Sequence, residues 1–148
     1  MDKRTKANIA LGLLLLLLPG FLIYAIFFHQ DLHTASREGD LQTVMEMVEA
    51  GKDIDVQDRG GNTPLMVAIS YGHINVVEYL LENGAQVNHR AVYQWTPLME
   101  AVSNRRIQMV KLLLEYGADP SAINNDGNTA LDIAVEKNDE AIVQLLEN

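Results

Sequence analysis

Histidines are the side chains of this sequence best suited to bind a metal or to move a proton near neutral pH. There are four, and His29 and His33 stand four positions apart with Asp31 between them. On a helix the two imidazoles would share one face. A zinc site takes three or four protein ligands, so this group is incomplete. We therefore predict no metal ion here.

Carboxylates at alternating positions raise a second possibility, a calcium-binding loop. Asp53, Asp55 and Asp58 approach that pattern, but the third ligand would fall on Gln57 and no glycine follows it. The sequence has no cysteine, which excludes thiolate metal sites and cysteine nucleophiles. It also lacks a glycine-rich phosphate loop and a serine-based triad pattern. We predict that the chain is not an enzyme and holds no cofactor.

The N-terminal region predicts a membrane segment. Residues 9–28 are 20 positions without a charge, and a helix of that length spans roughly 30 Å, the thickness of the hydrocarbon core of a bilayer. Residues 1–8 carry three basic side chains, whereas acidic residues dominate after the segment. The positive-inside rule places this basic N-terminus in the cytoplasm. We predict a single-pass signal-anchor helix over 9–28 in the inner (cytoplasmic) membrane, with residues 31–148 on the periplasmic or extracytoplasmic side.

A cleaved signal peptide is the alternative interpretation of the same segment, because such peptides combine a basic start with an apolar run and a small-residue site. Ala25 fits the last small position, but Ile23 is a poor partner for it. Pro19 and Gly20 lie within the apolar run, where a membrane helix tolerates them as a kink. Under either interpretation the segment exports the remainder of the chain.

The charge of the chain from Asp31 onward restricts its partners. This part holds 19 acidic and 8 basic residues, a net charge of −11. Such a domain repels phosphate backbones and anionic lipid surfaces, so we expect no nucleic acid to bind. A basic protein partner is favoured, although acidity also keeps a domain soluble. No feature of the sequence predicts a small-molecule substrate.

The sequence repeats with a period of 33 residues. The segment Thr-Pro-Leu-Met-Val-Ala at 63–68 returns as Thr-Pro-Leu-Met-Glu-Ala at 96–101 and as Thr-Ala-Leu-Asp-Ile-Ala at 129–134. A second apolar segment follows each of these in the same order, and a step of 33 back from Ala68 reaches Ala35. The chain from Asp31 therefore predicts four repeats without insertion, at about 31–58, 59–91, 92–124 and 125–148.

Each repeat predicts a pair of helices. Thr63 is placed to cap the first helix and Pro64 to occupy its first position, where a missing N–H costs nothing. Gly72 is suited to the left-handed residue that ends this helix, and Gly84 ends a second one with an apolar stripe. A single pair cannot bury its apolar face, so the pairs must stack into a solenoid.

These motifs resemble the ankyrin repeat, through Thr-Pro-Leu-x-x-Ala, Gly-His, Val-Val-x-x-Leu-Leu and Gly-Ala-x-Val-Asn at the 33-residue period. The resemblance implies an all-α solenoid of four antiparallel helix pairs joined by projecting β-hairpin fingers, and protein binding through the fingertips and the concave helix face. With the predicted transmembrane helix, the chain resembles short exported, membrane-anchored ankyrin proteins of Gram-negative bacteria. Glu140 and Glu147 replace the apolar Ile107 and Leu114, which predicts a polar outer side for the last repeat.

Departures from the repeat pattern indicate the binding surface. Between the second and third repeats the finger reads Ala-Val-Tyr-Gln-Trp, where the finger before it carries Asp58 and Gly61. By analogy with the family, Val92, Tyr93 and Trp95 lie at the fingertip with side chains largely in solvent. Aromatic residues at such positions anchor protein interfaces. The alternative is that Trp95 packs on adjacent fingers and stiffens the array.

The concave face supplies the remaining candidates. Tyr71 is predicted at the concave end of a first helix, with Ser103 and Asn104 in equivalent variable positions of the next repeat. Arg105 and Arg106 replace the Gly-His pair of the second repeat, and an arginine in a left-handed turn costs about 1 kcal/mol. Either these arginines reach toward an acidic patch on a partner, or the loop has a different geometry, which we favour. The predicted binding residues are Tyr71, Val92, Tyr93, Trp95, Ser103, Asn104, Arg105 and Arg106.

Together these patterns predict a membrane-tethered protein-binding module that holds, inhibits or protects an envelope (periplasmic) protein. Two alternatives remain open. The module is a scaffold or assembly factor that supports an envelope or redox-defence enzyme, or it is a secreted ankyrin protein if the N-terminal segment is cleaved.

Overall fold

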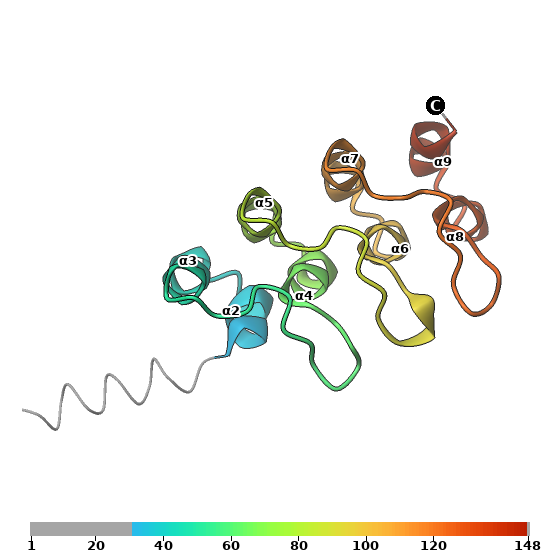
Figure 1. Ribbon diagram of the computed structural model, residues 1–148. Helices are drawn as coiled ribbons and strands as arrows, with labels where there is room; N and C mark the ends of the chain where they lie inside the picture. Colours follow the sequence, from blue (N-terminus) through green and yellow to red (C-terminus); the bar gives the residue numbers. More distant parts are fainter. Residues whose placement is uncertain (1–30, 148) are drawn as a thin grey trace, which may run out of the picture. The chain divides into compact units, whose positions relative to one another are not determined.

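The computed structural model describes residues 31–147 (Figure 1). This part of the chain forms four helix pairs and belongs to one compact unit, Leu32–Asn148. The first and second helices of the pairs are α2 Leu32–Glu38 and α3 Leu41–Glu49, α4 Pro64–Tyr71 and α5 Ile74–Glu82, α6 Pro97–Ser103 and α7 Ile107–Glu115, and α8 Ala130–Glu136 and α9 Glu140–Leu146. The predicted helix over 9–28 lies outside the described residues. Within 31–147, no helix has the length and apolar character needed to cross a bilayer.

The helix pairs stack in sequence order. The first helices form one row, in which α2 packs on α4, α4 on α6 and α6 on α8, and the second helices form a parallel row beside it (Figure 1). Close stacking of the first helices needs small side chains where they touch. The repeat supplies one alanine per pair, and all four are completely buried: Ala35, Ala68, Ala101 and Ala134.

A threonine caps the first helix of the second, third and fourth pairs. The hydroxyl of Thr63 accepts the backbone N–H of Met66 at 3.5 Å, and Thr96 accepts that of Met99 at 3.2 Å. In the last pair Thr129 and Asp132 form a reciprocal capping box. These bonds satisfy N–H groups that an α-helix leaves free at its start.

Two capping aspartates predict loss of stability in acid. The pKa of Asp40 is lowered by hydrogen bonds from the side chain and backbone of Thr43, and the pKa of Asp132 is lowered in the same way by Thr129. Because the folded-state pKa values lie below those of the unfolded chain, their stabilising contribution is present above the unfolded pKa and disappears as the pH falls through the folded one.

We therefore expect the melting temperature to fall more steeply between pH 6 and pH 3 in the wild type than in a variant carrying Asp40→Asn and Asp132→Asn. Asparagine is also a good N-cap at position 40, and at position 132 its amide oxygen can still accept the Thr129 N–H, so the variant keeps the helices while losing the titrating groups. Thermal melts followed by circular dichroism at both pH values measure the difference. Equal slopes for the two proteins would show that these caps do not couple folding to protonation.

The projecting fingers correct one prediction, because no strand forms within residues 31–147. Each finger is closed by two backbone hydrogen bonds at 2.9–3.1 Å: Asp58 N to Asn62 O with Gly61 N to Asp58 O, Ala91 N to Trp95 O with Gln94 N to Ala91 O, and Asn124 N to Asn128 O with Gly127 N to Asn124 O. Neighbouring fingers are joined by Val92 N to Gly60 O and by Asn125 N to Tyr93 O. These bonds close single turns but do not continue into a ladder, so the fingers are loops rather than β-hairpins.

The turn at Arg105 corrects a second prediction. Residues 39, 72, 105 and 138, spaced by the repeat period, all have positive φ, and Arg105 has a φ of 55°. The loop therefore keeps the repeat geometry, and our expectation of a different one was wrong. The Arg105 guanidinium donates to the Lys137 carbonyl at 2.6 Å. This bond to the next repeat offsets the strain of a left-handed non-glycine residue.

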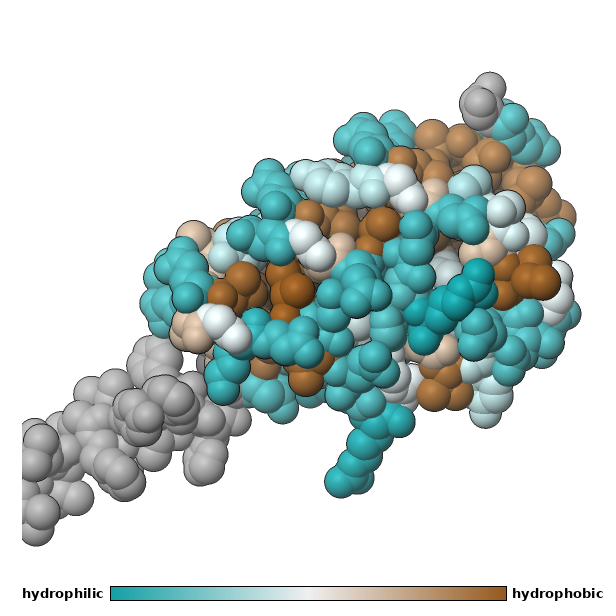
Figure 2. Space-filling model, viewed as in Figure 1, coloured by the Kyte–Doolittle hydropathy of each residue, from teal (hydrophilic) through white to brown (hydrophobic). Residues whose placement is uncertain are grey.

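The last repeat is only partly polar on its outer side. Glu140 and Glu147 are exposed as predicted. However, Val135 stands at the position of the buried Val102 and is 57% exposed. Apolar surface gathers over α9 near the C-terminal end (Figure 2). The last repeat therefore exposes apolar side chains beside its charged ones.

Candidate protein-binding surface

The second finger is built differently from its two neighbours. In the first finger the Asp58 carboxylate accepts the backbone N–H groups of Gly60 and Asn62, both at 2.8 Å. In the third finger the Asn124 amide oxygen plays the same part. The second finger has Ala91 at this position, and alanine offers no side-chain acceptor. This loop is therefore not closed by a side chain from its own first residue.

The backbone of the second finger is also strained. It forms a short 3₁₀ turn, Val92–Gln94, in which Tyr93 and Gln94 have φ values of 61° and 59°. The residues in register with Gln94 are glycines, Gly61 and Gly127. Consecutive left-handed non-glycine residues are rare, and such strain concentrates at functional sites.

This strain leads to a stability prediction. We expect Gln94→Gly to raise the free energy of unfolding by about 0.5–1 kcal/mol, because the relieved strain exceeds the added entropy of the unfolded chain. The matched control is Gly127→Ala, where φ is 81° and no atom would touch the new Cβ within 4 Å. This control should lose a similar amount from backbone strain alone. Urea unfolding measures the free energy of unfolding of both variants. Destabilisation by Gln94→Gly would show that the backbone at this position is not strained.

The two residues before Gln94 are the exposed apolar groups of the finger. Tyr93 is 71% exposed, the highest value among the large apolar side chains of the described part, and Val92 is 50% exposed. Burying such side chains in a complex stabilises it by roughly 25 cal/mol per Å² of apolar area. The structure thus places Val92 and Tyr93 in solvent, where our interpretation put them.

Trp95 does not follow that interpretation. Its ring is half-buried and packs against the core cluster, and its indole N–H donates to the Glu100 carboxylate at 2.8 Å. The expectation of a side chain largely in solvent was therefore wrong. The residues in register with Trp95 are Asn62 and Asn128, and the large ring reaches the helix that follows it, whereas these short side chains stay in their fingers.

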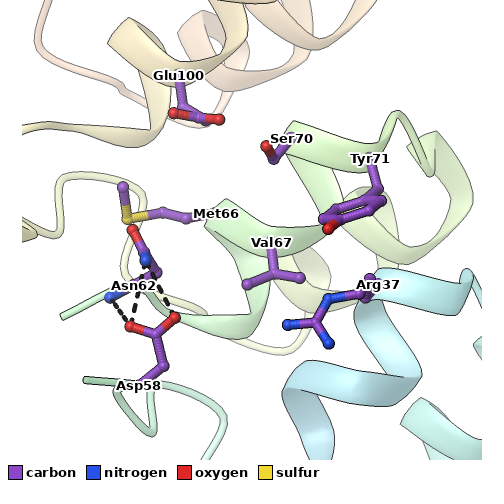
Figure 3. Close-up of a pocket in the computed structure, with 8 residues that line it drawn as sticks. All are labelled: Arg37, Asp58, Asn62, Met66, Val67, Ser70, Tyr71 and Glu100. Atoms are coloured by element: carbon purple, nitrogen blue, oxygen red, sulfur yellow. Dashed lines mark hydrogen bonds between the residues drawn. The ribbon is translucent and has the colours of Figure 1, made fainter. Parts of the chain in front are cut away.

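The concave face contains a cavity of about 310 Å³ (Figure 3). Tyr71 lies at its edge, 55% exposed, with the Arg37 guanidinium over its ring at 5.8 Å from the centroid. Asp58 with Asn62 lies on another side, and Glu100 lies across from them (Figure 3). The remaining lining residues are Met66, Val67 and Ser70.

The electrostatics of this groove are dominated by its carboxylates. Burial alone would raise the pKa of Asp58, but hydrogen bonds from the Asn62 side chain and from backbone N–H groups, with the charge of His33, lower it overall. Glu100 accepts hydrogen bonds from Trp95 and from the Asn104 amide at 2.9 Å. Glu100 is therefore held by neutral donors, which do not cancel its charge, whereas the charge of His33 also acts on Asp58.

The other predicted residues occupy separate places. Ser103 is half-buried at the end of α6, and Asn104 is exposed beside it and bonded to Glu100. Arg105 faces the last repeat through Lys137. Arg106 covers Gly72, where an added Cβ would lie 2.8 Å from the Arg106 Cζ. The two arginines thus link repeats, and the structure does not gather them with the fingertip.

Sequence reasoning missed Arg37, Asp58 and Glu100 as groove residues. One signal was available: Glu100 stands in register with Thr34, Val67 and Ile133, none of which is charged. An isolated charge in an otherwise neutral row of a repeat protein indicates a role outside the repeat consensus.

The described histidines have structural roles. The Nε2 atoms of His33, His73 and His89 lie 2.8–2.9 Å from the backbone carbonyls of Asn62, Arg37 and Gly61, respectively. The contacts of His33 and His73 join neighbouring repeats, and that of His89 joins two segments of the second repeat. Over residues 31–147, no group of three or more metal-binding side chains occurs. His29, the other histidine of the proposed pair, lies outside these residues.

Helix pairs stacked at a 33-residue interval, with loops projecting from one side, define a helical solenoid repeat protein. The family model described as ankyrin repeats (3 copies) matches residues 32–124 and 92–148, and the chain belongs to this family. Ankyrin repeats are protein–protein interaction modules, and this chain carries one.

Several known proteins are similar to part of the chain. Cyclin-dependent kinase inhibitor 2A of Monodelphis domestica is 46% identical over 48 residues, which are 32% of this chain and 28% of the relative. The probable E3 ubiquitin-protein ligase XBOS33 of Oryza sativa is 38% identical over 71 residues, 47% of this chain and 14% of the relative. The acyl-CoA-binding domain-containing protein 4 of the same species is 38% identical over 50 residues, 34% and 15% respectively. The matches thus cover a small part of each relative.

Proposed function

We propose that this protein is a membrane-tethered binding module that holds, inhibits or protects a protein of the cell envelope. The observation that carries the proposal is the second finger. It lacks the side-chain acceptor that closes the two neighbouring fingers, and it exposes Val92 and Tyr93 to solvent. Strain and exposed apolar area are both unfavourable in the free protein. A partner that covers these side chains removes their apolar area from water.

The tether is proposed from the sequence of residues 9–28. An anchor confines the module to a layer beside the membrane and so raises the effective concentration of partners in that layer. Alkaline phosphatase fused after Asn148 tests the topology, because this enzyme is active only after export from the cytoplasm. Activity in the membrane pellet after carbonate washing supports the anchor, activity released in soluble form indicates cleavage, and an inactive fusion contradicts export.

The binding role is tested by capture. The full chain, purified in mild detergent and immobilised through a C-terminal tag, is exposed to envelope extract, and retained proteins are identified by mass spectrometry. The comparison is a Val92→Ser, Tyr93→Ser double variant. Val135→Ser serves as the matched control because this valine is similarly exposed, at 57%, on the last repeat.

A protein retained by the wild type and the control but lost from the double variant supports the proposal. Retention by all three would place the binding surface elsewhere, and retention by none would contradict the binding role. The activity of a captured enzyme, with and without the module, then separates an inhibitor from a scaffold.

A further inference from the structure

Glu100 is a charged residue held in a defined orientation on the concave face. Its Oε2 atom accepts the indole N–H of Trp95 at 2.8 Å, and its Oε1 atom accepts the Asn104 amide at 2.9 Å. Neither donor occurs at the equivalent positions of the preceding repeat, where Asn62 and Tyr71 stand. Trp95, Glu100 and Asn104 thus form a small network particular to the third repeat.

A second carboxylate lies across the cavity from this network. Asp58 is held by Asn62 and by backbone N–H groups of its own finger. Met66 lies between the two acidic groups, and its side chain, with that of Val67, gives the cavity an apolar floor (Figure 3). The arrangement combines two fixed negative charges with a short apolar strip.

Arg37 does not neutralise this end of the cavity. Its guanidinium lies over the Tyr71 ring, on the α2 side of the cavity, whereas Glu100 projects from α6 (Figure 3). The cavity therefore has a cationic, aromatic end and an anionic end with an apolar floor. A ligand that fits both ends must carry a positive group at a defined place along its length.

We infer that the anionic end binds a lysine or arginine side chain of the protein partner, with the charged group between Asp58 and Glu100 and the aliphatic stem on Met66 and Val67. Basic side chains place apolar stems and charged tips in this way. The inference rests on the proposed function, since it names the chemistry by which the same concave face recognises its partner. The acidity of the whole domain, −11 from Asp31 onward, favours approach of such a segment.

Trp95 and Asn104 act in this arrangement as positioning residues. Each holds one oxygen of Glu100. The carboxylate is therefore already ordered in the free protein, and binding of the partner costs less side-chain entropy. Tyr71 and Arg37 form the opposite end, where the guanidinium meets carbonyl or carboxylate groups of the same segment. The order of these charges gives the bound segment one direction along the stack.

A random dodecapeptide phage library, selected on the full chain in lipid nanodiscs, tests the inference. Parallel selections use Glu100→Gln and the matched control Glu82→Gln, which removes the same charge from the exposed end of α5. We expect the wild type and the control to enrich peptides with lysine or arginine at one fixed position. The Glu100→Gln protein should lose that preference.

Synthetic peptides from the selection then give the coupling directly. Two versions of each peptide carry arginine or its neutral isostere citrulline at the enriched position. The wild type should bind the arginine peptide about fivefold more tightly than the citrulline peptide, as expected for a partly exposed charge pair. The Glu100→Gln protein should bind both peptides equally. Trp95→Phe keeps a ring but removes the donor, and should lower the arginine-to-citrulline ratio without weakening the citrulline peptide. Fluorescence anisotropy of labelled peptides measures all of these.

The outcomes separate the two proposals. Enriched peptides that need Val92 and Tyr93 but show no basic preference would overturn this inference and leave the proposed function standing. An equal arginine-to-citrulline ratio in the wild type and the Glu100→Gln protein would also overturn it. Failure to enrich any peptide over empty nanodiscs would count against the proposed function and this inference together.

Discussion

Replacing Val92 and Tyr93 with serine is expected to weaken binding of the captured partner at least about 30-fold. Removal of an interface anchor costs about 2 kcal/mol or more, and a tyrosine with a neighbouring aliphatic group is a typical anchor. The two side chains are 50% and 71% exposed, so they contribute little to the packing of the free protein. The free energy of unfolding should therefore change by no more than about 0.5 kcal/mol.

Isothermal titration of the partner with the full chain measures the affinity, and urea unfolding measures the stability of the same samples. Val135→Ser is the control for removal of exposed apolar area and should leave the affinity unchanged. If the double variant bound with wild-type affinity, the second finger would not be the contact. If it lost both binding and stability, the loss of binding would say nothing about the interface.

A buried leucine of the third repeat is expected to give the largest loss of stability. Leu98 is 1% exposed in α6, between the neighbouring first helices α4 and α8. We expect Leu98→Ala to lower the free energy of unfolding by about 3 kcal/mol, the sum of a transfer cost and a cavity cost. In a solenoid this loss weakens the contacts of one pair with both neighbours.

Leu131 provides the matched control, because it stands in the same register in α8 but is only partly buried. The same substitution there should cost about 1 kcal/mol, since the side chain is already partly in solvent and its removal leaves no enclosed cavity. Urea unfolding followed by circular dichroism at 222 nm compares the two variants. Equal losses would contradict the view that stacking, rather than the leucine itself, determines the cost.

The sequence was sufficient to determine the repeat architecture because the signals are local and repeated. Threonine and proline at the helix starts, glycine at the turns and an apolar stripe every 33 residues each act within a few residues of themselves. Four copies in register leave stacking as the way to bury their apolar faces. The exposure of Val92 and Tyr93 was predicted from the resemblance to the ankyrin family, which places both residues at a fingertip.

The tertiary structure decided what depends on contacts between segments. The guanidinium of Arg105, which stands at the left-handed turn common to all four repeats, reaches a carbonyl in the next repeat, 32 residues away. Trp95 turns away from solvent because Glu100 on the following helix accepts its indole N–H. The concave cavity brings together residues from three repeats, among them Arg37, Asp58 and Glu100. Repeat periodicity defines which positions face one another. The orientation of a side chain depends on the hydrogen-bond partner within its reach, which lies in the next repeat for Arg105 and on the following helix of the same repeat for Trp95.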